Sequence, residues 1–155
     1  MHNREAYTEF VEKTYFGNVE SGQLDAIMAC FDPDATVIIR HGDNPERCFC
    51  VSASADETPL VEFYKHLCSN YEARFNDFQH FIDHETQRAS CYFKVRLKPK
   101  PEGLYAGTGQ QELFNCNFFE FRDDLITHMI IYYANPRSGD PTSGSYDPPT
   151  GYPKV

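Results

Sequence analysis

The feature that most constrains the fold of this chain is a change of hydrophobic period at about residue 70. Before it, apolar residues recur every three or four positions, which is the spacing of one face of a helix. After it, apolar and polar residues alternate, as in CYFKVRLK at 91–98, which is typical of a half-buried strand. The sequence therefore predicts helices first and long strands after them.

Three helices are predicted in the first part of the chain. The first carries an apolar stripe over residues 7–19, and the second over 24–31, where DPD at 32–34 is expected to end it. For the third helix, Thr58 and Pro59 supply an N-cap and a first-turn proline. Its predicted core stripe is Leu60, Tyr64, Leu67, Cys68 and Tyr71.

Strands make up the rest of the prediction. In chain order the segments with strand character are 36–39, 48–51, 75–82, 91–98, 112–121 and 125–136. A tight turn, RDD, is expected to join the last two. Residues 136–155 hold prolines and glycines without periodicity, so we expect one domain over residues 1–135 and a tail without regular structure.

The strand at 112–121 places two amides among apolar side chains. Period-two alternation puts Asn115 and Asn117 on the same face as Leu113, Phe119 and Phe121. Burying an amide without a partner costs about 1–3 kcal/mol, so these amides are either satisfied by neighbours or face a cavity. The second alternative predicts a binding site.

The opposite face of that strand carries Phe114, Cys116 and Phe118. A strand that is apolar on both faces is expected when one side packs helices and the other packs a second subunit. We therefore predict a homodimer.

Composition excludes several classes of partner. With 23 acidic and 14 basic residues the formal charge is −9, which argues against nucleic acid and against an anionic membrane. The first residues lack signal-peptide character, and no apolar run approaches the ~18 residues of a membrane span, so a cytoplasmic location is expected. No metal site is predicted, because His80 and His84 would lie about 13 Å apart along a strand.

Two segments carry a resemblance to a known family. TYFGNVESGQLDAIMACFDPDATV at 14–37 resembles a ketosteroid isomerase pattern, and FEFRDDLITHMIIYYANP at 119–136 resembles the aromatic-rich ending of that fold. The order of elements is similar to that of the SnoaL-like and ketosteroid isomerase-like members of the NTF2-like superfamily. This resemblance implies an α+β cone, in which three N-terminal helices pack on a strongly curved, mainly antiparallel sheet.

The resemblance also implies roles for individual residues. Tyr15 falls on the tyrosine that donates a hydrogen bond to a dienolate oxygen in the isomerases, and Asn117 falls on their protonated aspartic acid. Ile39 falls on their aspartate general base and cannot move a proton. By alternation, His80 is predicted as the remaining ionisable side chain on the pocket face.

Two functions follow from this reading. The first is a small cofactor-independent enzyme that catalyses proton transfer, in an isomerisation, cyclisation or dehydration, on a hydrophobic carbonyl-containing substrate of polyketide or terpenoid type. The second is a non-catalytic module of the same superfamily that binds a small molecule or a protein. Besides the candidate catalytic residues Tyr15, Asn117 and His80, the predicted pocket wall consists of Ile39, Phe93, Val95, Leu97, Asn115, Met129, Ile131 and Tyr133.

Overall fold

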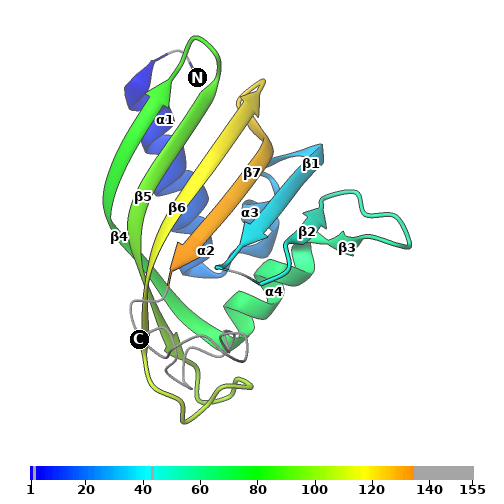
Figure 1. The fold of residues 1–155 in the computed structure, drawn as a ribbon, viewed down its shortest axis with the longest axis vertical. Helices are drawn as coiled ribbons and strands as arrows, with labels where there is room; N and C mark the ends of the chain where they lie inside the picture. The colour runs from blue at the N-terminus through cyan, green and yellow to red at the C-terminus, as the bar shows by residue number, and fades with distance from the viewer. Residues whose placement is uncertain (2, 43, 135–155) are drawn as a thin grey trace, which may run out of the picture.

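A computed structural model describes residues 1, 3–42 and 44–134. Within them, helices cover one face of a curved, unclosed sheet of seven strands (Figure 1). This is the α+β architecture that the sequence predicts. The predicted tail at 136–155 lies outside the described residues. No helix in the described part of the chain is long and apolar enough to cross a membrane.

The elements follow the predicted order. The helical segments are α1 (Arg4–Glu9), η1 (Phe10–Phe16), α2 (Gly17–Ser21), α3 (Leu24–Met28) and α4 (Leu60–Asn70). The strands are β1 (Phe31–Arg40), β2 (Arg47–Cys50), β3 (Thr58–Pro59), β4 (Tyr71–Asp83), β5 (Arg88–Pro99), β6 (Gln111–Arg122) and β7 (Leu125–Ala134).

The first helix is continuous from α1 to α2, but its middle segment, η1, is a π-helix. Its buried stripe repeats every four residues, at Tyr7, Val11, Tyr15 and Val19. In an α-helix of 3.6 residues per turn, each step of four residues rotates the stripe by about 40°. The wider turn of a π-helix opposes this rotation. Tyr15 and Val19 therefore stay against the sheet.

Long antiparallel strands form the centre of the sheet, whose order is β3-β2-β1-β7-β6-β5-β4. Strands β4 to β7 pair antiparallel in sequence, while β1 pairs parallel with β7. The predicted tight turn between β6 and β7 contains Asp123 and Asp124, both with positive φ (50° and 63°), as hairpin turns require. Asp77, with φ 58°, lies in a break of register in β4.

Three predicted helix boundaries are wrong. Helix α3 ends at Met28, and Asp32-Pro33-Asp34 belongs to β1, where the pairing with β7 is irregular between Phe31 and Thr36. Such an irregularity tolerates a proline, which has no N–H for the ladder. At α4, Pro59 itself is the N-cap and follows Thr58 in β3, so the predicted cap is displaced by one residue. Tyr71, predicted as helical, begins β4.

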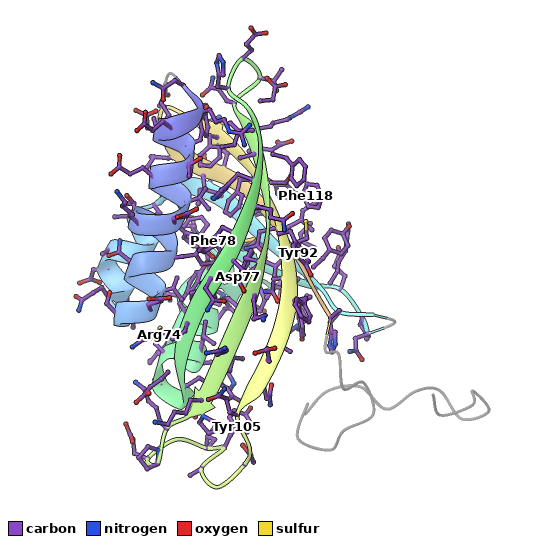
Figure 2. All side chains as sticks on the ribbon, turned by 90° about the vertical axis from the view of Figure 1, so that its left-hand side faces the viewer. Arg74, Asp77, Phe78, Tyr92, Tyr105 and Phe118 are labelled. Atoms are coloured by element: carbon purple, nitrogen blue, oxygen red, sulfur yellow. The ribbon has the colours of Figure 1, made fainter. Side chains whose placement is uncertain are left out.

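The outer face of the sheet, opposite the helices, carries aromatic side chains. Figure 2 shows Tyr92 and Phe118 pointing away from the helices, while Phe78 points toward them. Phe118 is 47% exposed, and it contacts Tyr132 edge to face. The predicted homodimer rests on Phe114, Cys116 and Phe118 of this face, of which Phe118 is exposed and the other two are half-buried. The homodimer itself stays a prediction.

Candidate functional site

The inner face of the sheet, under the helices, divides into two halves along the strands. One row of paired residues crosses it through Ile39, Ile131 and Asn117. Toward the β6–β7 turn lies the packed half, defined by the next row: Val37, Met129, Phe119, Ala89 and Ile82. Away from that turn lies the hollow half, which begins with the row of Tyr133, Asn115 and Phe93.

A cavity of about 210 Å³ occupies the hollow half. Its walls are mainly apolar and come from the first helix, α4, β1 and β4 to β7. Most of the predicted pocket residues line it: Tyr15, Ile39, Phe93, Val95, Leu97, Asn115, Asn117, Ile131 and Tyr133. Met129 and His80 are absent from its lining. Met129 is fully buried in the packed half.

The floor of the cavity holds a pair of tyrosines. The hydroxyl oxygens of Tyr15 and Tyr64 lie 2.7 Å apart, and both residues are buried. Two hydroxyls carry two protons, and only one is used in the bond between them. One O–H is therefore left to donate into the cavity. Burial raises the pKa of Tyr15 and that of Tyr64 well above the usual value, so the pair stays protonated and acts as a donor.

Two asparagines line the wall beside this floor. The amide oxygens of Asn115 and Asn117 are both buried, and neither has a hydrogen-bond partner among the described residues. The two residues are therefore not satisfied by each other. Asn117 is 1% exposed, and its amide nitrogen donates only to the sulfur of Met129, at 3.8 Å. Because buried amides normally find partners, these oxygens favour a ligand that offers hydrogen-bond donors.

His80 lies on the inner face, as alternation predicts, but against the first helix. Its Nε2 is 2.7 Å from Oε1 of Glu12, and its side chain is 7% exposed. His80 pairs with Cys91 across the sheet, whereas the cavity lining on β5 begins one row further on, at Phe93. The predicted base is therefore outside the cavity in this structure.

One side of the cavity rim is built by β1, β2 and β7. The ring of His41, at the end of β1, stacks on Tyr133 with centroids 4.0 Å apart. Arg47 of β2 donates to the Tyr133 hydroxyl at 3.4 Å. Partial burial and the Arg47 charge lower the pKa of His41 below its ordinary value of 6.5. His41 is therefore a neutral imidazole at neutral pH.

The opposite side of the rim comes from α4 and the loop after β5. Nε2 of His66 is 3.2 Å from the hydroxyl of Tyr105, and its Nδ1 is 3.4 Å from the amide nitrogen of Asn70. Asn70 also accepts the backbone N–H of Leu104 at 2.7 Å, which holds the loop against α4. Both ring nitrogens of His66 therefore lie within hydrogen-bond distance of a protein group. This makes His66 a weaker candidate for a general base.

None of the described side chains that line the cavity carries a carboxylate. Among the described residues the lining contains His41, Arg47 and His66 but no aspartate, glutamate, lysine or cysteine. No cluster of three or more His, Cys, Asp or Glu side chains in that part of the chain is placed to hold a metal ion. The arrangement can bind an apolar molecule, donate a hydrogen bond at the floor and accept a proton at the rim.

Sequence reasoning missed Tyr64 and the three rim residues. Tyr64 was assigned to the core stripe of its helix, although a buried tyrosine hydroxyl needs a partner and Tyr15 was the available one. His41 follows the last residue of β1 and Arg47 is the first residue of β2, where period two does not indicate a direction. His66 lies within α4, outside the predicted core stripe of that helix. Only pairing between strands brings Arg47 onto the same face as Ile39.

Comparisons with known proteins support the fold. No protein-family model matches the chain, and no curated protein matches it in sequence. Among solved structures, a candidate polyketide cyclase from Xanthomonas campestris pv. campestris is 22% identical, with a TM-score of 0.63 over 84% of this chain and 92% of that one. A second candidate polyketide cyclase, from Silicibacter sp., is 23% identical, with a TM-score of 0.60 over 86% and 91%.

A third solved structure is the epoxide hydrolase/cyclase-like enzyme SalBIII, which has a role in pyran ring formation in the polyether salinomycin. It is 16% identical, with a TM-score of 0.65 over 86% of this chain and 95% of that one. Identities this low show a shared fold and do not transfer an activity. The chain has the cone-shaped α+β fold of the SnoaL-like and ketosteroid isomerase-like proteins.

Proposed function

We propose that the protein is a cofactor-independent enzyme that transfers a proton on an apolar carbonyl-containing substrate of polyketide or terpenoid type. The outcome would be an isomerisation, a cyclisation or a dehydration. The single observation that carries the proposal is the Tyr15–Tyr64 hydroxyl pair, at 2.7 Å, on the floor of a mainly apolar cavity. Solved cyclase-like structures of the same fold support the same reaction class.

The tyrosine pair would stabilise an enolate. Removing a proton next to a carbonyl places negative charge on the carbonyl oxygen, and a preorganised donor in a water-poor site stabilises that charge. Tyr15 would donate to the oxygen while Tyr64 donates to Tyr15, so that each bond strengthens the other. The amide group of Asn117, at the same wall, would accept a substrate hydroxyl or donate a second bond.

His41 would be the proton acceptor. It lines the cavity and its lowered pKa keeps it neutral at pH 7. Its Nδ1 lies 3.2 Å from the side chain amide of Asn44. For Nε2 to accept the proton, the proton of the neutral ring must lie on Nδ1, which requires the amide oxygen of Asn44 in the place of its nitrogen.

The positions of the two groups restrict the substrate. The tyrosine pair is buried at the floor, whereas His41 is half-buried at the rim. The carbonyl oxygen would therefore lie toward the floor, and the carbon that loses its proton would lie toward the rim. A planar ring system with an acidic C–H next to its carbonyl can be placed in this way.

Proton exchange tests the proposal without knowledge of the natural substrate. In D2O the protein should accelerate exchange of the benzylic protons next to the carbonyl of 2-tetralone, which NMR can follow. Tyr15→Phe should slow exchange by about 10²–10³-fold, the usual loss when one oxyanion donor is removed. Phenylalanine keeps the shape of the floor, so a melting curve like that of the wild type is the control.

The pH profile gives a second readout. A base works only when it is deprotonated, so exchange should fall as the pH drops through the pKa of His41. That pKa is below 6.5, so the rate should be flat through neutral pH and fall only at lower pH. A rate that begins to fall above pH 7 would exclude His41 as the base.

The second candidate is a binding module without turnover. The absence of any carboxylate from the described lining favours it, because many proton-transfer sites use one. Binding of 2-tetralone with no acceleration of exchange over buffer would establish this candidate and overturn the proposed activity.

A further inference from the structure

Two arginine–tyrosine pairs lie on opposite faces of the sheet, with Arg40 on β1, Arg47 on β2 and both tyrosines on β7. On the outer face Arg40 donates to the hydroxyl of Tyr132, and on the inner face Arg47 donates to the hydroxyl of Tyr133. The two tyrosines are neighbours in β7, so their side chains project to opposite sides of the sheet. The sheet thus repeats one arrangement on its two faces.

The two pairs differ in one component. Arg40 has a carboxylate partner, because its Nε lies 2.6 Å from Oε2 of Glu46. Within the described residues Arg47 has no carboxylate partner. Its hydrogen bond is to the Tyr133 hydroxyl, and its guanidinium keeps donors to spare. On the inner face, no described side chain takes the position beside Arg47 that Glu46 takes beside Arg40.

Arg47 lines the cavity at its rim, where its side chain is also exposed to solvent. It lines the same space as the tyrosine pair and Asn117, whose buried amide oxygen has no partner. The chain has 23 acidic residues, yet none of the described ones reaches this lining. The cavity therefore offers a cation at its rim and hydrogen-bonding groups at its floor, with an apolar wall between them.

We infer that the ligand of this cavity is an elongated apolar molecule with a carboxylate at one end and a hydroxyl or enol oxygen at the other. The carboxylate binds Arg47 at the rim, next to the stacked His41 and Tyr133. The oxygen at the far end meets Tyr15 and Asn117 at the floor. This inference deepens the proposed function, since it names the substrate class of the same site. A planar guanidinium matches a carboxylate, which it can bind through two parallel hydrogen bonds.

Four related probes test the two ends separately. The full probe is 6-hydroxy-2-naphthoic acid, whose fluorescence reports binding. Its methyl ester lacks the charge, 2-naphthoic acid lacks the hydroxyl, and methyl 2-naphthoate lacks both. Each is titrated against the wild type, Arg47→Gln, Asn117→Leu and Arg40→Gln at low ionic strength, because salt screens an exposed ion pair.

We expect Arg47→Gln to weaken binding of both acids about tenfold and to leave both esters within twofold. Arg40→Gln is the matched control, since it removes the same charge one strand away on the outer face, and it should change none of the affinities. Asn117→Leu should weaken the two hydroxyl probes about tenfold and spare the two that lack the hydroxyl.

The possible results are distinguishable. If Arg47→Gln leaves the acids unchanged, weakens acids and esters alike, or acts no differently from Arg40→Gln, the carboxylate site is wrong. If the hydroxyl confers no affinity and Asn117→Leu has no effect, the floor part fails and the proposed function loses its support, while the carboxylate site stands. If none of the four probes binds the wild type at millimolar concentration, the inferred ligand class is wrong.

Discussion

The packed and hollow halves of the inner face are made from the same strands but differ in what covers them. In the packed half, the ring of Phe121 contacts those of Tyr7 and Phe10 edge to face, with ring centroids 5.1 and 5.7 Å apart. Apolar side chains fill the space between the first helix and the sheet there. In the hollow half, Asn115 and Asn117 keep two buried amide oxygens without partners around a cavity.

Each strand therefore has one end that mainly stabilises the fold and another end that forms the cavity. Close packing gives the larger share of the folding free energy, because dispersion contacts and apolar burial add up over many atoms. Buried amide oxygens without hydrogen-bond partners lower the stability of the fold. They are expected where a bound ligand supplies the missing hydrogen-bond donors. We therefore expect substitutions in the packed half to change stability, and substitutions in the hollow half to change binding and catalysis.

Truncation of one aliphatic side chain in each half should give the largest contrast in stability. Met129→Ala should reduce the free energy of unfolding by about 3–5 kcal/mol, because Met129 is fully buried and its removal opens a new void. Leu113→Ala should cost about 2 kcal/mol, since Leu113 already borders the cavity. Urea unfolding measures both, and equal costs would contradict the division into halves.

The two histidines of the inner face test the same division through activity. His80→Leu removes the 2.7 Å bond to Glu12 and should lower the free energy of unfolding by about 1.5–3 kcal/mol, the range for a hydrogen bond to a charged group. Glu12 is 36% exposed and can regain water, which favours the lower end of that range. Exchange of 2-tetralone protons per folded molecule should stay within twofold of wild type.

His41→Leu should do the reverse. It should slow exchange by about 10²-fold or more, the usual contribution of a general base, and leave the urea midpoint nearly unchanged. If His80→Leu abolishes exchange in a folded protein and His41→Leu does not, the assignment of the base made from the sequence is right and the present one is wrong.

The smallest expected effect has the opposite sign. Asn117→Leu replaces an unsatisfied buried amide by an apolar side chain of similar size, so the free energy of unfolding should rise by about 1 kcal/mol. This gain should accompany the loss of affinity for hydroxyl probes. A destabilised variant would mean that Asn117 supports the fold through contacts that leucine cannot make.

Much of the framework could be predicted because it rests on periodicity. Alternation placed Phe93, Val95 and Leu97 on the inner face, and it put Asn115 and Asn117 beside them, where the structure has them. Such patterns are reliable when a strand is long, because a slip of one residue would turn every apolar side chain outward.

The position along a strand could not be predicted in the same way. His80 has the predicted face and shares a row with Asn117, but the cavity does not extend along this row to β4 and β5, where His80 packs against the first helix through Glu12. The Tyr15–Tyr64 bond joins residues 49 positions apart, and no local pattern encodes it. Arg47 and His41 depend on loop ends, whose direction is set by tertiary contacts.

The π-helical segment η1 has a consequence for how this site can change over evolutionary time. A π turn is equivalent to one residue inserted into an α-helix. If the segment from Phe10 to Phe16 became a regular α-helix without losing a residue, Tyr15 and Val19 would rotate relative to Tyr7. Substitutions that change the preference for the π turn can therefore re-aim the tyrosine at the floor while the packed end of the helix keeps its place.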